Sequence, residues 1–176
     1  ALALNETNSD LAAGGSLGVA LNALNYAFER DYASLIASVS DTGESLDTFP
    51  IVFAANYRLR QFGEAANYLE GSSIGESVLK AEFTDIRSNA LDVAHTIEQT
   101  GNLEQAAAIR GRMRENMARL LTGEAIWHAR AQHELDMLLL ASEGQIDQAL
   151  NAFEALYADG WRWLMGPGQV LAGGFR

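Results

Sequence analysis

Apolar residues recur at intervals of three and four positions along most of this chain, which is the spacing of one face of an α-helix. Such patterns extend over residues 16–29, 32–39, 49–60, 63–69, 103–120, 124–142 and 145–158. Between the fourth and fifth patterns, one unbroken stripe predicts a single long helix of about 24 residues, with a kink near Thr84 as the alternative to a straight helix. Its members are Leu79, Phe83, Ile86, Ala90, Val93 and Ile97. No stretch alternates apolar and polar residues as a β-strand does, so the pattern predicts an all-α fold.

Several of the predicted helices are joined by the same short sequence motif, made of a turn residue, a large apolar residue and an alanine three positions later. The three copies are Gln61-Phe62-Gly63-Glu64-Ala65, Gly101-Asn102-Leu103-Glu104-Gln105-Ala106 and Gly144-Gln145-Ile146-Asp147-Gln148-Ala149, with a weaker copy at Arg30-Asp31-Tyr32-Ala33-Ser34-Leu35. We expect the apolar residue to fill the corner between two helices and the alanine to allow their close approach. Gly101 and Asn102 are predicted to end one helix and cap the next. Repetition of this kind is typical of stacked helical hairpins.

Through these motifs, the chain resembles a divergent tetratricopeptide-repeat array. It is similar in this to helical modules that are attached to larger bacterial proteins. The likeness is strongest in the third repeat, at Ala90, Val93, Ala94, Ile97, Gly101, Leu103 and Ala106. The apolar corner residues follow one another at intervals of 30, 41 and 43 residues, against a family period of about 34. The resemblance implies a solenoid of about four antiparallel helical hairpins with an aromatic C-terminal cap.

Three regions are predicted from this organisation. Residues 1–15 are expected to be a flexible lead-in, residues 16–160 the repeat domain, and residues 161–176 a capping segment whose Trp161 and Trp163 cover the open end of the stack. The chain begins with Ala1 rather than methionine, so we expect it to be part of a longer protein. Whether that protein belongs to the bacterial cytoplasm or periplasm stays open, because the absence of cysteine fits both.

The resemblance implies a non-enzymatic scaffold or regulatory module that binds a protein segment in a concave groove, the segment belonging to a separate protein or to another domain of the parent chain. Carried over position by position, the groove residues are Tyr57, Arg58, Ser88, His95, Gln99 and Glu134. The alternative is a helical sensor of a small ligand, with a pocket near Trp127, Trp161 and Trp163.

The charge pattern narrows the possible partners. The chain carries 23 acidic and 12 basic residues, a formal net charge of −11, so we expect neither nucleic acid nor an anionic membrane as partner, and no apolar run is long enough to insert into a bilayer. Arg110 and Arg114 lie four residues apart in the only basic cluster and form an alternative anion-binding site. They could equally pair with Glu104, with Glu115 or with acids on the adjoining helix.

Catalytic and metal chemistry find little support in the sequence. His128 and His133 are five residues apart, so they do not share a helix face as two metal ligands would. His95 lies near no evident serine nucleophile with an orienting acid. We therefore expect no bound metal, no cofactor and no enzymatic activity.

Overall fold

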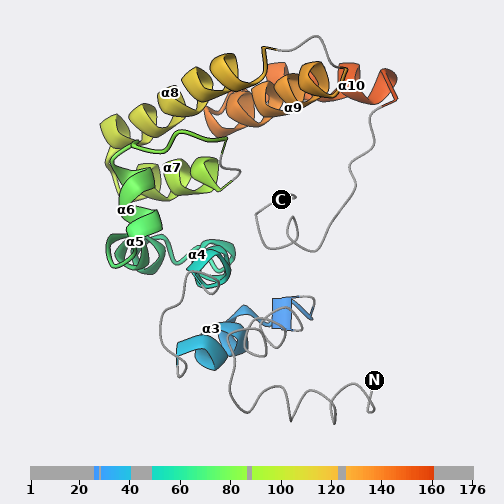
Figure 1. Cartoon of the computed structure of the whole chain (residues 1–176). Helices are drawn as coiled ribbons and strands as arrows, with labels where there is room; N and C mark the ends of the chain where they lie inside the picture. Colours follow the sequence, from blue (N-terminus) through green and yellow to red (C-terminus); the bar gives the residue numbers. More distant parts are fainter. Residues whose placement is uncertain (1–25, 28, 41–48, 87–88, 123–125, 161–176) are drawn as a thin grey trace, which may run out of the picture. The chain divides into compact units, whose positions relative to one another are not determined.

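A computed structural model describes most of the chain as helices (Figure 1). The described residues are 26–27, 29–40, 49–86, 89–122 and 126–160. Across these ranges every regular element is a helix and no strand occurs, which confirms the all-α class. The predicted lead-in at 1–15 and the predicted aromatic cap at 161–176 lie outside the described residues.

The chain divides into two compact units, the first comprising Ala1–Ile74 with Met165–Arg176 and the second Gly75–Leu164. The described helices of the first unit are α3 (Tyr32–Ser40), α4 (Phe49–Arg58) and α5 (Phe62–Glu70), and α4 contacts both of the others. The core between α3 and α4 consists of Ala27, Leu35, Val39, Ile51, Val52 and Ala55, and Tyr68 of α5 packs against it. These positions include the inward-facing residues of α3 and α4, so the helical periodicity of the sequence translates directly into packing.

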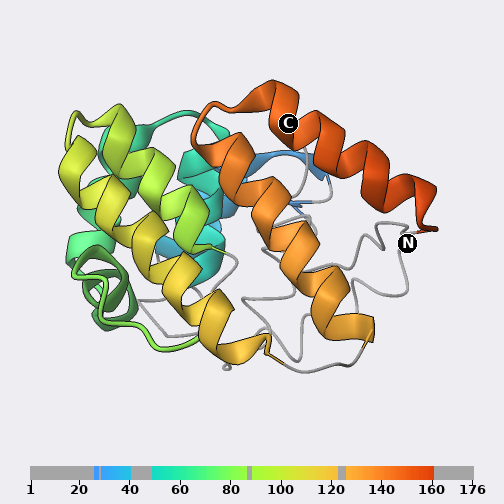
Figure 2. The same ribbon diagram turned by 90° about the horizontal axis from the view of Figure 1, so that it is seen from above.

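The second unit contains two helical hairpins. Helix α7 (Ala90–Gln99) pairs with α8 (Leu103–Leu120), and α9 (Ile126–Ser142) pairs with α10 (Ile146–Ala158). Helix α9 also contacts α7 and α8, so it lies between the first hairpin and α10 (Figure 2). Helix α10 lies at the edge of this unit in Figure 2 and packs chiefly against α9.

The repeated motifs fold into helix–helix corners that share one backbone conformation. In each, one residue takes a left-handed conformation, with φ of 59° at Arg30, 57° at Arg60, 95° at Gly101 and 74° at Gly144. The N–H of the following residue then donates to the carbonyl five positions earlier, for example from Asn102 to Ile97 at 3.1 Å. This is the hydrogen-bonding pattern of the Schellman helix end. Two of the four corners therefore use arginine where glycine is the usual residue.

The corner alanines lie where the sequence predicts. Ala65 and Ala106 are completely buried and Ala149 is nearly so, which is the burial that a close helix contact at these positions requires. The large apolar residues are only partly as predicted, because Tyr32 and Phe62 are half-buried whereas Leu103 and Ile146 are exposed. In the second unit these two side chains therefore do not fill the corner, and the prediction is wrong there.

Side chains cap two of the helices after these corners. The Asn102 carboxamide oxygen accepts from the Gln105 N–H at 3.1 Å, which confirms its predicted role at the start of α8. Asp31 precedes α3 and accepts from the Ser34 N–H at 3.1 Å. Hydrogen bonds from the Ser34 side chain and backbone lower the pKa of the Asp31 carboxyl below its usual value, because they stabilise the charged form.

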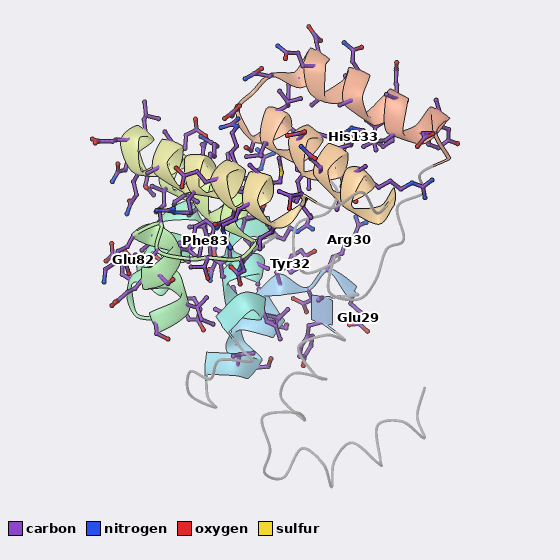
Figure 3. All side chains as sticks on the ribbon, turned by 45° about the horizontal axis from the view of Figure 1, so that its top comes forward. Glu29, Arg30, Tyr32, Glu82, Phe83 and His133 are labelled. Atoms are coloured by element: carbon purple, nitrogen blue, oxygen red, sulfur yellow. The ribbon has the colours of Figure 1, made fainter. Side chains whose placement is uncertain are left out.

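The stripe from Leu79 to Ile97 does not form the predicted single helix, and the interruption near Thr84 is a non-helical segment rather than a kink. The chain forms the short helix α6 (Ser73–Leu79), leaves helical geometry over residues 80–86, and resumes as α7 at Ala90. Ala81 has a φ of 53°, and the N–H of Glu82 donates to the Ser77 carbonyl, so α6 ends in the same way as the corners. Phe83 is buried beneath α8 whereas Glu82 points away from it (Figure 3).

Polar side chains of α8 hold this non-helical segment in place. Asn116 donates to the carbonyls of Phe83 at 3.1 Å and Asp85 at 2.9 Å. Further contacts run in the same order along both segments: Gln105 to the Leu79 carbonyl, Arg112 to Ala81 and Arg119 to Thr84. These donors satisfy carbonyls that a continuous helix would have paired internally.

Candidate functional site

The first two predicted groove residues lie in α4, and the structure does not expose Tyr57. Tyr57 is 5% exposed, stacks on Phe53 with ring centroids 6.1 Å apart, and meets Phe62 of α5 edge-on at 5.9 Å. Its expected role as an exposed groove anchor is therefore wrong. The physical reason is that α4 is apolar almost throughout, and residues 51–57 are all buried. Arg58, at the end of the helix, is half-buried.

The remaining predicted groove residues belong to the second unit or lie outside the description. His95 is half-buried on α7, Gln99 is exposed at the end of the same helix, and Glu134 is half-buried on α9, which α7 contacts. Ser88 lies outside the described residues. Tyr57 and Arg58 belong to the first unit, whereas His95, Gln99 and Glu134 belong to the second, so the predicted positions are described as parts of two separate units.

The two arginines of the alternative anion site are already engaged with acids of the protein. Arg110 is buried, and its Nη2 donates to the Glu98 carboxylate at 2.6 Å and to the Ser142 carbonyl at 2.7 Å. Arg114 pairs with Glu143, just after α9. Both arginines therefore connect α8 to neighbouring helix ends, as the ion-pair interpretation of the sequence expected. Arg110 and Arg114 therefore form ion pairs that hold neighbouring helices together, rather than an open anion site.

Metal and membrane sites receive no support from the described ranges. Over those residues no group of three or more histidine, aspartate or glutamate side chains could hold a metal ion. Nor does any helix among them combine the length and apolar character needed to cross a bilayer.

The most conspicuous surface feature lies on α10 and was not among the predicted sites. Four large apolar side chains are exposed there: Ile146 at 54%, Leu150 at 54%, Phe153 at 37% and Tyr157 at 54%. They are spaced by four, three and four residues, so they form one stripe, which we call the α10 seam. Phe153 and Tyr157 stack with ring centroids 6.3 Å apart. Soluble proteins seldom leave a contiguous apolar stripe exposed unless it serves as a contact surface.

Helix α10 thus has two apolar faces. Ala149 and Leu156 are buried, and they lie about 90° around the helix from the α10 seam. In heptad terms the seam residues occupy d, a, d and a positions, Ala149 and Leu156 occupy g, and the exposed acids Asp147 and Glu154 occupy e. The seam therefore has packed protein on one side and a row of carboxylates on the other.

The sequence analysis did not predict this surface, because it assigned the apolar residues of 145–158 to a single helix face. Ile146 in particular was expected to fill a corner. The signal was nevertheless present, since apolar residues cover more of the α10 circumference than one packed face requires. A helix with two adjacent apolar faces needs two neighbours.

No family model, no curated protein and no solved structure matches this chain.

Proposed function

We propose that this chain is a non-enzymatic protein-interaction module whose partner docks along the α10 seam. The partner is a segment of another protein or of a longer parent chain. The proposal keeps the kind of function that the sequence predicts and moves the docking surface from the groove to α10 of the second unit.

The exposure of the α10 seam carries this proposal. Ile146 and Leu150 each leave about half of their surface in water, one helical turn apart at the start of α10. Covering such side chains contributes about 25 cal/mol for each Å² of apolar area removed from water. A partner helix packed on the seam would gain this energy without any rearrangement of the α9–α10 hairpin.

A pair of matched substitutions tests the proposal. Leu150→Glu places a charge in the middle of the seam, whereas Ala155→Glu places the same charge at an exposed position on the opposite side of α10. Both variants should retain the helicity and melting temperature of the parent protein, because both positions are exposed.

Binding is measured with a purified partner, first recovered by proximity labelling from the source cells and then titrated calorimetrically. Loss of a central apolar anchor costs about 2 kcal/mol, so Leu150→Glu should weaken binding about 30-fold, and Ala155→Glu should leave it unchanged. If Leu150→Glu binds such a partner as tightly as the parent protein does, the seam is not the docking surface.

A further inference from the structure

We infer that the α10 seam takes an amphipathic helix that carries lysine or arginine beside its own apolar stripe. This inference rests on the proposed function and adds the chemistry of the partner. It is drawn from the charges that border the seam.

The open border of the seam is acidic. Asp147 and Glu154 are both exposed and lie seven residues apart, about 10 Å along the same side of α10. In paired helices, residues at e positions lie beside the apolar seam and form ion pairs that select the partner. A helix that places two cations seven residues apart beside its own a and d residues would meet both carboxylates.

The hairpin itself supplies almost no cations to balance these acids. The stretch 126–159 contains a single arginine, Arg130, and no lysine. Its acids are Glu134, Asp136, Glu143, Asp147, Glu154 and Asp159. Of these, Glu134 and Glu143 already have interaction partners, which for Glu143 is Arg114 of α8. The local potential therefore favours a basic partner and raises its rate of association.

A second copy of the chain is a poor occupant for the same reason. Antiparallel pairing of two α10 helices would place e positions opposite each other, so Asp147 and Glu154 would face carboxylates. Parallel pairing would place them opposite g positions, which are Ala149 and Leu156 and are already buried. Neither arrangement offers a cation, and each copy carries a net charge of −11.

Two synthetic helical peptides test the inference on the full chain by fluorescence anisotropy. Both have leucine at the a and d positions over three heptads; one has lysine at e and g, and the other has glutamate. The lysine peptide should bind about tenfold more tightly than the glutamate peptide, and the difference should shrink with added salt, which screens exposed charges. In the double variant Asp147→Asn/Glu154→Gln, the preference for the lysine peptide should disappear. The matched control Glu82→Gln/Glu104→Gln removes two exposed acids elsewhere in the second unit and should retain the preference.

Other results would overturn the inference in distinguishable ways. Equal binding of both peptides, lost in Leu150→Glu, would reject the basic partner and leave the docking surface intact. If neither peptide binds while a natural partner still requires Leu150, a basic helix is not sufficient for docking on the seam, and the inference is rejected. A dimer in sedimentation that Leu150→Glu dissociates would make a second copy the occupant. Peptide binding only in Trp161→Ala/Trp163→Ala would assign the seam to the chain's own C-terminal segment.

Discussion

Arg110 and Glu98 join the two helices of the α7–α8 hairpin through a hydrogen bond of 2.6 Å between Nη2 and the carboxylate. The same Nη2 donates to the carbonyl of Ser142 at the end of α9, so one guanidinium connects three helices. The Arg110 side chain is 8% exposed and that of Glu98 34% exposed, which places the pair largely out of water. Removing the guanidinium would leave both the Glu98 carboxylate and the Ser142 carbonyl without this donor.

Replacing Arg110 by methionine, which keeps most of its volume, should lower the free energy of unfolding by about 2 to 3 kcal/mol. The loss follows because Glu98 and the Ser142 carbonyl would lose their shared donor. Arg114→Met is the matched control, since the Arg114 side chain is 46% exposed, and should cost less than about 1 kcal/mol. Urea titration followed by circular dichroism measures both. Equal losses would show that Arg110 does not act as a buried clamp.

Asn116→Ala should destabilise the segment between α6 and α7. Asn116 is 3% exposed and donates to two carbonyls that have no helical partner, so its removal should cost about 2 kcal/mol. Hydrogen exchange should also become faster over residues 80–86. Asn151→Ala, at an exposed position of α10, should change neither quantity. Unchanged exchange in Asn116→Ala would mean that α8 does not hold this segment.

The break between α6 and α7 shows where prediction from the sequence stops. The stripe through Leu79, Phe83 and Ile86 has sound helical spacing, and local propensity alone favours a continuous helix. The donors that hold the segment extended come from α8, and Asn116 lies 31 and 33 residues beyond its acceptors. Periodicity cannot register such tertiary hydrogen bonds. The corner alanines and the Asn102 cap were predictable because their causes lie within a few residues.

The same distinction applies to the candidate site. Tyr57 was expected to be exposed because a family pattern was carried over to its position, yet the apolar run of α4 already argued for burial. The α10 seam could have been found from its heptad spacing, but the sequence does not say which of two apolar faces α9 covers. That choice depends on how the hairpin packs.

Arg60→Gly should stabilise the protein. Arg60 has a φ of 57°, a conformation that costs side-chain-bearing residues energy and that glycine adopts freely. Glycine also increases the conformational entropy of the unfolded chain, which offsets part of this stabilisation. The free energy of unfolding should therefore rise by about 0.5 to 1 kcal/mol, seen as a higher melting temperature. Gln61→Gly, at the next position with a φ of −84°, should destabilise instead. A lower melting temperature for Arg60→Gly would contradict the left-handed corner.

Ala106→Leu should overpack the contact between α7 and α8. Ala106 is fully buried, so the isopropyl group that leucine adds has to displace neighbours, at a cost of about 1 to 3 kcal/mol. Ala107→Leu, at the next and exposed position, should have little effect. Thermal unfolding compares the two. If both variants melt alike, the close approach assigned to the corner alanine is wrong.

The most direct test of the account is a photocrosslinking scan along α10 in the full chain, performed in the source cells. A benzophenone amino acid is placed singly at the seam positions and, as controls, at exposed positions away from the seam. The seam positions are 146, 150, 153 and 157, and the controls are 148, 151, 155 and 158. Docking on the α10 seam predicts that the yield of crosslinks to one partner protein is high at every seam position and low at every control position. Crosslinking that is uniform around the helix, or strongest at the controls, would contradict the α10 seam as the docking surface.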